Sequence, residues 1–194
     1  MTVGILLLAG GRSRRYGSDK RLAQLATGKT LLNTCIDTIT RAELPLVVCL
    51  GRGDRVLAAE LADRNICYQI CPNSGSGMGN TLAEGVAAVP GCWHGLIIAL
   101  GDMPFIQAAT YRSVAAAVTP GNIVVPICSD VRGHPVGFGR AFFDDLGSLH
   151  GDRGAKDIVA AKAEVVVHID VRDPGISIDV DSPGDLDRLL QEKV

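Results

Sequence analysis

The sequence is poor in aromatic residues and close to neutral in charge. Phe, Trp and Tyr make up 4% of the 194 residues, and the formal net charge at pH 7 is −2. Proteins that bind single-stranded nucleic acid use aromatic side chains for stacking and an extended basic surface for the backbone. This chain has only one short basic segment, so we expect no nucleic-acid partner.

Long apolar runs are also missing. No stretch approaches the roughly 20 apolar residues that cross a bilayer. The N-terminal apolar run, residues 3–8, is short and has no basic region before it. We therefore expect no signal peptide, no membrane association and a cytoplasmic location.

The cysteines do not form a dense framework. They are spread along the chain, mostly in apolar or strand-like settings: Cys35, Cys49, Cys67, Cys71, Cys92 and Cys128. This distribution is typical of buried thiols rather than of a disulfide-rich scaffold. Cys67 and Cys71 are close in sequence, but neither a Cys-x-x-Cys pair nor a nearby histidine completes a zinc site.

Short apolar segments alternate with helical patterns along the chain. The β-rich segments are residues 3–8, 45–50, 67–70, 95–100, 122–126, 165–169 and 176–180, and helical spacing of apolar residues occurs in 31–41, 55–65 and 81–89. This alternation predicts a layered α/β fold with its ligand crevice at the carboxyl ends of the strands. The length suits a single domain spanning residues 1–194.

The first strand leads into a glycine- and arginine-rich segment. After Gly10 and Gly11, Ser13 is surrounded by cations, namely Arg12, Arg14, Arg15 and Lys20. Backbone N–H groups freed by glycines, a helix N-terminus and nearby cations form a pocket for phosphate groups. Because a strand precedes the segment, we favour a phosphate-binding loop over a solvated basic turn.

A second phosphate motif is only apparent. The segment "ATGKTLL", residues 26–32, ends like a Walker A loop, in which Lys29 and Thr30 would hold phosphate and magnesium. The pattern requires a glycine where the chain has Ala23, and no strand directly precedes it. We expect Gly28 to form a turn and Thr30 to cap the helix that follows.

A carboxylate ends the apolar segment "GLIIALGDMPF", residues 95–105. Asp102 lies where a buried strand opens into the crevice, and an aspartate beside a phosphate site is suited to hold Mg²⁺. The alternative is that Asp102 caps a helix beginning near Gln107. We favour the metal because the spacing is long for a cap and Pro104 fits that role poorly.

Two further carboxylates stand near the C-terminus. In "ISIDVDSPGDLDRLL", Asp179 and Asp181 alternate as on a strand, which would send both to the same side. One or both could complete a metal site. Since Ser182-Pro183 then begins a helix, an N-cap role for Asp181 remains equally open.

Three glycine-containing loops carry additional polar groups. "NSGSGMGNTLAEG", residues 73–85, opens a helix and offers backbone donors, such as that of Gly79, and side chains including Asn80 for a base or ribose. In "DVRGHPVGFG", residues 130–139, His134 has a rigid and exposed setting, although a lone histidine is usually a surface or packing residue. Asp152 and Arg153 lie in a loop that could grip an anionic acceptor.

Together these motifs resemble a known family. "LAGGRSRRYGSDK" is similar to the signature LA(G/A)GxSxRxGxxK of nucleotidyltransferases with a Rossmann-like glycosyltransferase-A fold, which include the molybdenum cofactor guanylyl- and cytidylyltransferases. "GDMP", "RGHPVGFG", "GDRGA" and "DVDSPGDL" follow in the order seen in the cytidylyltransferase branch. The resemblance covers residues 8–186.

The resemblance implies a fold and a set of site residues. The fold is a single three-layer αβα Rossmann-like domain with a mostly parallel mixed sheet, of the nucleotide-diphospho-sugar transferase type. The catalytic residues are expected to be Arg15, Lys20 and Asp102, and Mg²⁺ is expected on Asp102 and Asp181. The expected nucleotide-binding residues are Leu8, Ala9, Gly10, Gly11, Ser13, Arg15, Lys20, Gly79, Asn80 and Asp102. The acceptor-binding residues are expected to be His134, Asp152 and Arg153.

The resemblance also implies an activity. The protein is expected to transfer NMP from an NTP to a molybdopterin-type cofactor with release of pyrophosphate, and a molybdoenzyme is a possible recipient of the product. CTP is favoured over GTP by the later motifs, whereas LAGG in place of LAAG is typical of the guanylyl branch. The missing Cβ at Gly10 is expected to leave room for a larger base. The alternatives are transfer to a sugar or polyol phosphate and a non-catalytic protein that delivers the cofactor.

Overall fold

A computed structural model describes residues 1–11, 19–182 and 184–185 of the chain. The strands are β1 (Thr2–Leu8), β2 (Leu46–Gly51), β3 (Cys67–Cys71), β4 (Trp93–Leu100), β5 (Ile123–Cys128), β6 (Val131–Arg132), β7 (Val136–Gly139) and β8 (Val166–Asp170). The α-helices are α1 (Leu31–Arg41), α2 (Arg55–Asp63), α3 (Met78–Ala88), α4 (Ala108–Ala117), α5 (Phe143–Gly147) and α6 (Lys156–Ala161). Short 3₁₀ helices include Lys20–Leu22, Ser74–Ser76 and Pro174–Ser177.

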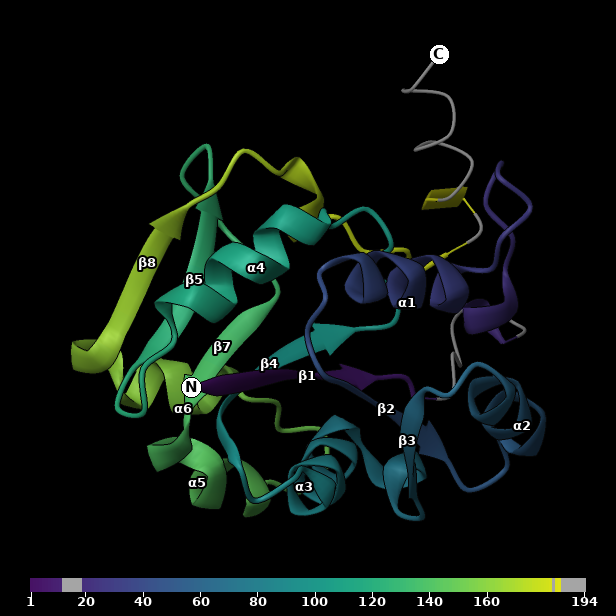
Figure 1. The fold of residues 1–194 in the computed structure, drawn as a ribbon, viewed down its shortest axis with the longest axis horizontal. Helices are drawn as coiled ribbons and strands as arrows, with labels where there is room; N and C mark the ends of the chain where they lie inside the picture. The colour runs from purple at the N-terminus through teal and green to yellow at the C-terminus, as the bar shows by residue number, and fades with distance from the viewer. Residues whose placement is uncertain (12–18, 183, 186–194) are drawn as a thin grey trace.

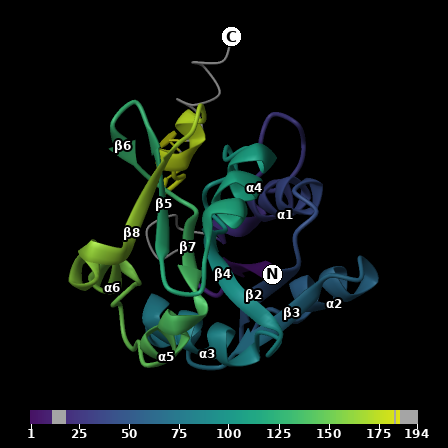
Figure 2. The same cartoon turned by 60° about the vertical axis from the view of Figure 1, so that its left-hand side comes forward.

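The described strands form one mixed sheet of eight strands. The order is β3-β2-β1-β4-β7-β5-β6, and β8 pairs with β5. The pairs β3-β2, β2-β1, β1-β4 and β5-β8 are parallel, whereas β7 is antiparallel to both β4 and β5. Figure 2 shows β8 beside β5 at one side of the sheet. The carboxyl ends of β1, β2, β3 and β4 therefore meet at one edge.

Helices cover both faces of the sheet (Figure 1). Alternate residues of β1 point to opposite faces: Ile5 and Leu7 pack in a core with α1, α2 and α4, while Leu6 and Leu8 pack in a second core with α3 and α5. A strand buried on both faces reads as a continuous apolar run, which is the pattern of β1. The expected three-layer α/β fold with a mostly parallel mixed sheet is confirmed.

Most predicted elements are confirmed within a few residues. Strands are present at six of the seven predicted segments, and helix 31–41 has the predicted bounds. Thr30 caps α1 by accepting a hydrogen bond from the Asn33 N–H at 3.2 Å. Gly28 has φ +77°, the left-handed conformation that a tight turn requires and glycine adopts readily.

Two predictions about elements were wrong. Residues 176–180 are not a strand, since the segment begins in the 3₁₀ helix Pro174–Ser177 and continues without pairing to the sheet. Residues 130–139, expected to be a loop, contain β6 and β7. The two glycines of "VGFG" favoured a loop at residues 136–139. The segment is instead the strand β7, which lies antiparallel between β4 and β5.

The cysteines differ in how deeply they are buried. All six cysteines are free; Cys35, Cys49 and Cys71 are buried, Cys128 is half-buried, and Cys67 and Cys92 are exposed. Burial of the cysteines is therefore less general than expected.

Among the described residues, none of the helices has the length and apolar character needed to span a membrane.

Candidate nucleotidyl-transfer site

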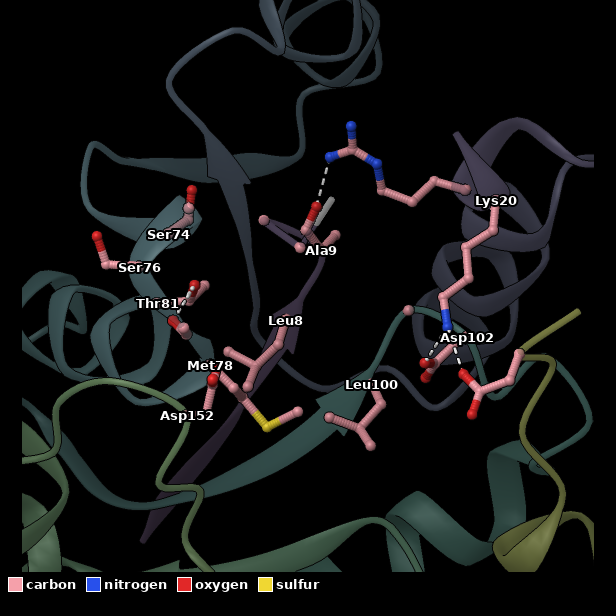
Figure 3. A pocket seen from close by; sticks show the side chains of 17 residues that line it. Leu8, Ala9, Lys20, Ser74, Ser76, Met78, Thr81, Leu100, Asp102 and Asp152 are labelled. Carbon is pink, nitrogen blue, oxygen red and sulfur yellow. Dashed lines mark hydrogen bonds and ion pairs between the residues drawn. The ribbon is translucent and has the colours of Figure 1, made fainter. Parts of the chain in front are cut away.

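A cavity of about 690 Å³ lies at the carboxyl ends of β1, β3 and β4. Its lining comes from six parts of the chain: Leu8–Gly11, Lys20 with Arg21, Ser74–Met78 with Thr81, Leu100–Asp102, Asp152 and Asp181. Figure 3 shows Ser74, Ser76 and Thr81 on one side and Lys20 with Asp102 on the other, with Leu8 and Leu100 between them. The cavity thus has a hydroxyl-rich end and a charged end.

The charged end is built around the ammonium group of Lys20. Lys20 Nζ donates to Asp102 Oδ2 at 2.7 Å and to Asp181 Oδ1 at 3.0 Å (Figure 3). Burial alone would lower the pKa of Lys20, but the hydrogen bonds and charges of the two aspartates outweigh it and raise the pKa above its ordinary value. The lysine is therefore charged at neutral pH, and it links two carboxylates that are far from it and from each other in sequence.

Asp102 has the features expected of a metal ligand. Among the described residues its buried Oδ1 atom has no hydrogen-bond partner, although its other oxygen pairs with Lys20. A buried carboxylate oxygen without a partner is costly in a folded protein unless a ligand satisfies it. No cluster of three or more His, Cys, Asp or Glu side chains suited to a metal occurs in the part of the chain that the structure describes. Asp102 and Asp181 fit a Mg²⁺ ion that takes its other ligands from phosphate and water.

Neither carboxylate is occupied as a helix cap. The first turn of α4 is capped by Asp173, whose Oδ2 accepts from the Gln107 N–H at 2.8 Å and from Thr110 Oγ1 at 2.6 Å. At the C-terminal turn, Asp185 Oδ2 accepts from the Ser182 N–H at 2.8 Å, and the Asp185 N–H donates to Ser182 Oγ at 3.2 Å. The side chain of Asp181 is thus left for Lys20, which removes the capping alternative that the sequence had left open.

Arg21, which sequence reasoning missed, also lines the cavity. Its side chain is 10% exposed and forms ion pairs with Asp19 and Asp54 at 2.6 and 2.5 Å. Burial would lower the pKa of Arg21, but both carboxylates raise it above its ordinary value, and the Arg21 hydrogen bond lowers the pKa of Asp19. A signal was available in the sequence: Asp54 follows the strand that neighbours β1, and Arg21 follows Lys20 directly.

The glycines after β1 differ in their surroundings. A Cβ atom added to Gly10 would meet the Ser74 Cβ at 2.9 Å and the Thr81 Cγ2 at 3.1 Å, whereas one added to Gly11 would meet nothing within 4 Å. Gly10 is therefore needed for close packing between β1 and the Ser74 loop. The expectation that its missing Cβ leaves room for a larger base was wrong, because that space is filled by Ser74 and Thr81.

Two predicted nucleotide-binding residues lie outside the cavity lining. The Gly79 N–H donates to the Gly151 carbonyl at 2.8 Å, and Asn80 Oδ1 accepts from the Gly151 N–H at 2.5 Å. A Cβ on Gly79 would lie 2.5 Å from the Arg153 carbonyl oxygen. Gly79 and Asn80 therefore hold the loop that carries Asp152, which does line the cavity, while Arg153 does not.

His134 is less exposed than expected. Its buried Nδ1 atom has no hydrogen-bond partner in residues 1–11, 19–182 and 184–185, and its backbone N–H donates to the Ile176 carbonyl at 2.8 Å. Burial lowers the pKa of His134, and the negative charge of Asp102 offsets this only in part. The imidazole is therefore neutral at pH 7, and it lies outside the cavity lining.

Three further residues from the predicted phosphate motifs are Ser13, Arg15 and Lys29. Ser13 and Arg15 lie outside the described residues. Lys29, from the apparent Walker A motif, has a side chain that is 58% exposed and forms an ion pair with Asp37 at 2.5 Å. This pairing agrees with the rejection of a P-loop.

Comparisons with known proteins place these features in context. The family model of the MobA-like NTP transferase domain matches residues 5–166. A nicotine blue oxidoreductase from Paenarthrobacter nicotinovorans is 26% identical over 95% of each chain. The bifunctional protein GlmU of Burkholderia thailandensis is 31% identical over 76% of this chain, which spans 32% of that protein. The chain covers about a third of the GlmU proteins it matches.

Solved structures agree with the family match. Rv0371c from Mycobacterium tuberculosis H37Rv has a TM-score of 0.85 at 29% identity, with 98% of each chain covered. Another structure of Rv0371C, in complex with manganese, has a TM-score of 0.83 at 27% identity, covering 98% of this chain and 99% of that one. Molybdopterin-guanine dinucleotide biosynthesis protein A from Archaeoglobus fulgidus shares the fold, with a TM-score of 0.68 at 18% identity and 98% coverage of both chains. The chain belongs to the family of MobA-like NTP transferases.

Proposed function

We propose that this protein is a Mg²⁺-dependent nucleotidyltransferase that transfers NMP from an NTP, preferably CTP, to a molybdopterin-type acceptor and releases pyrophosphate. The observation that carries the proposal is the meeting of Lys20, Asp102 and Asp181 at one end of the cavity, with one oxygen of Asp102 buried and unsatisfied. We further propose that residues 1–194 form a single domain and that the protein acts in the cytoplasm.

Asp102 and Asp181 would hold the Mg²⁺ ion, which supplies charge neutralisation for the phosphates when bound. Lys20, released from the two carboxylates, would neutralise the negative charge of the departing pyrophosphate together with Arg15. Phosphoryl-type transfer depends mainly on positioning and charge neutralisation, so these residues need no covalent role. The acceptor would attack the α-phosphorus from the side opposite the pyrophosphate.

The nucleotide would lie along Leu8, Ala9, Gly10 and Gly11, with Ser13 as a further phosphate-binding residue. The hydroxyl-rich end adds Ser74, Ser76 and Thr81 as candidates for the base or ribose, because they line the same cavity. Gly79 and Asn80 would act indirectly, through the loop they hold. Selectivity then depends on hydrogen bonds to the base edge, and an unpaired donor costs about 1 to 3 kcal/mol, roughly 5- to 150-fold.

The acceptor would lie nearest Asp152, which lines the cavity, with Arg153 and His134 beyond it as further candidates. A molybdoenzyme would receive the finished cofactor. The alternatives are transfer to a sugar or polyol phosphate and, because a nicotine blue oxidoreductase is among the relatives, an oxidoreductase acting on nicotine blue.

The test is pyrophosphate release by the purified protein with Mg²⁺ and CTP, GTP, UTP or ATP, each combined with molybdopterin, a sugar phosphate or a polyol phosphate. We expect release with CTP and molybdopterin, and a smaller rate with GTP. Release only with a sugar or polyol phosphate would show that this phosphate, and not molybdopterin, is the acceptor. A preference for GTP would show that the base is guanine rather than cytosine. Oxidation or reduction of nicotine blue, without pyrophosphate release in any mixture, would refute the transferase. Binding of molybdopterin without pyrophosphate release would favour the non-catalytic protein that delivers the cofactor.

A further inference from the structure

The guanidinium group of Arg21 is fully engaged inside the protein. Its Nε and Nη2 atoms donate to the two oxygens of Asp19 at 2.8 and 2.6 Å. Nη2 and Nη1 donate to the two oxygens of Asp54 at 2.7 and 2.5 Å, and Nη1 also donates to the Ala9 carbonyl at 2.5 Å. A guanidinium has five N–H donors in a rigid fork, and these bonds use all of them. Arg21 has no donor left for a phosphate, although it lines the cavity.

The partners of Arg21 come from three separate parts of the chain. Ala9 follows β1, Asp54 precedes α2, and Asp19 precedes the 3₁₀ helix Lys20–Leu22. Asp54 Oδ2 also accepts from the N–H of Gly51, the last residue of β2, at 2.7 Å, and Asp19 Oδ1 accepts from the Arg21 N–H at 3.1 Å. Arg21 therefore ties the start of the Lys20–Leu22 helix to the carboxyl ends of β1 and β2.

These contacts of Arg21 lie directly beside Lys20 in the chain. Arg21 is its immediate neighbour, and Figure 3 shows the Lys20 side chain extending toward Asp102, at the end of β4. We propose that Arg21 is a positioning residue of this nucleotidyltransferase site: its anchored fork fixes the backbone of Lys20 so that the ammonium group meets Asp102 and Asp181. The inference rests on the proposed function for its catalytic consequence, but the geometry it describes exists without substrate.

Arginine is required here for its shape as well as its charge. Lys in place of Arg21 would keep one positive charge between Asp19 and Asp54, but an ammonium group cannot form two bidentate pairs and a carbonyl bond in one plane. Arg21→Lys thus separates geometry from charge. Asp54→Asn tests the same hydrogen bonds from the acceptor, since it keeps the Arg21 guanidinium and removes one of the two carboxylates that it binds.

The direct test is lysine-selective ¹⁵N NMR of the protein without nucleotide or metal. The Lys20 Nζ signal is assigned by its absence in Lys20→Met. In Arg21→Lys and Asp54→Asn we expect this signal to move toward the position of exposed lysines, because its ion pairs loosen. Lys29, which pairs with Asp37 elsewhere, is the internal control and should not move. An unchanged Lys20 signal in either folded variant would overturn the proposal.

Turnover gives a second readout, which separates positioning from stability. With Arg21→Lys we expect kcat for pyrophosphate release to fall roughly tenfold or more, because a small misplacement of a catalytic group is costly. Arg64→Met, which removes an arginine paired with Asp37 at 2.6 Å, is the matched control and should keep the kcat of the wild type. A folded Arg21→Lys protein with normal kcat would contradict the proposal. A wild type without any pyrophosphate release would refute the proposed function, while the NMR comparison would still decide the role of Arg21.

Discussion

The two carboxylates that meet Lys20 belong to regions of different construction. Asp102 follows β4, a strand paired on both sides, and the preceding Gly101 N–H donates to the Leu8 carbonyl at 3.0 Å. Asp181 lies in a segment that pairs with no strand of the described sheet, and its side chain is 55% exposed, against 25% for Asp102. One carboxylate is thus held by the sheet and the other by a loop.

A few contacts fix the loop-borne carboxylate. The Val180 N–H donates to the Asp102 carbonyl at 3.0 Å, and the Ile176 carbonyl accepts from the His134 N–H. Farther away, Asp173, a residue that is only 2% exposed, joins this segment to α4 through its side chain. Preorganised groups contribute most to catalysis, whereas weakly held segments open more easily. From this difference we expect Asp102 to carry the essential charge and Asp181 to adjust to the bound nucleotide.

The largest effect is expected at the sheet-held position. Asp102→Ala should abolish detectable pyrophosphate release, because the metal loses its buried ligand and the transition-state charge is left uncompensated. The fold should persist, which cooperative thermal unfolding would verify. Near-normal turnover in the folded variant would contradict the expectation that the sheet-held Asp102 carries the essential charge.

Lys20→Ala should lower kcat by roughly 10²-fold, the size seen when one preorganised charge-stabilising group is removed. Binding of Mn²⁺ alone should change in the opposite direction, tightening by roughly fivefold, because the ammonium no longer competes for the two carboxylates. Lys29→Ala is the matched control for both measurements. A rise in the Michaelis constant alone would make Lys20 a ground-state binder, and weaker Mn²⁺ binding would contradict the competition.

Asp181→Asn should have a smaller effect than Asp102→Ala. We expect kcat/KM for the nucleotide to fall by roughly tenfold, comparable to losses seen when a supporting metal-site group is altered. A water molecule can replace an exposed ligand more easily than a buried one. Steady-state kinetics at several Mg²⁺ concentrations measures the loss. Complete inactivation would show that the two carboxylates are equivalent.

The smallest catalytic effect is expected at Asp173, whose carboxylate accepts hydrogen bonds from Gln107, Thr110 and Gly175 and so anchors the loop of Asp181. Asp173→Asn loses part of a buried hydrogen-bond set, so the free energy of unfolding should fall by about 1 to 3 kcal/mol. Turnover should fall only a few-fold, less than in Asp181→Asn, as chemical denaturation and kinetics would show. A greater loss of kcat than in Asp181→Asn would mean that Asp173 acts on more than that loop.

The same contrast explains what the sequence could predict. Continuous apolar runs predicted β1 and β4, and the rule that ligands lie at strand ends predicted that Lys20 and Asp102 would both lie in the crevice. The loop of Asp181 was mistaken for a strand, because its alternating residues are held by Asp173 and His134 rather than by a neighbouring strand. Such contacts between residues far apart in sequence leave no local pattern.

Arg21 escaped prediction for the same reason. Its acceptors Ala9 and Asp54 are brought together by the pairing of β1 with β2, and only Asp19 is near it in sequence. Gly79 matched a loop typical of nucleotide sites, yet its N–H is used by the Gly151 carbonyl. Composition and spacing identify candidate donors, but not which of them the folded chain has already satisfied.

The most direct measurement is Mn²⁺ titration of the wild type, Asp102→Asn and Asp181→Asn, each with a non-hydrolysable CTP analogue. The account predicts that the wild type binds Mn²⁺ in the nucleotide complex, that Asp181→Asn binds it more weakly, and that Asp102→Asn loses this binding while remaining folded. Equal Mn²⁺ affinity in Asp102→Asn and the wild type would contradict the assignment of Asp102 as the buried metal ligand.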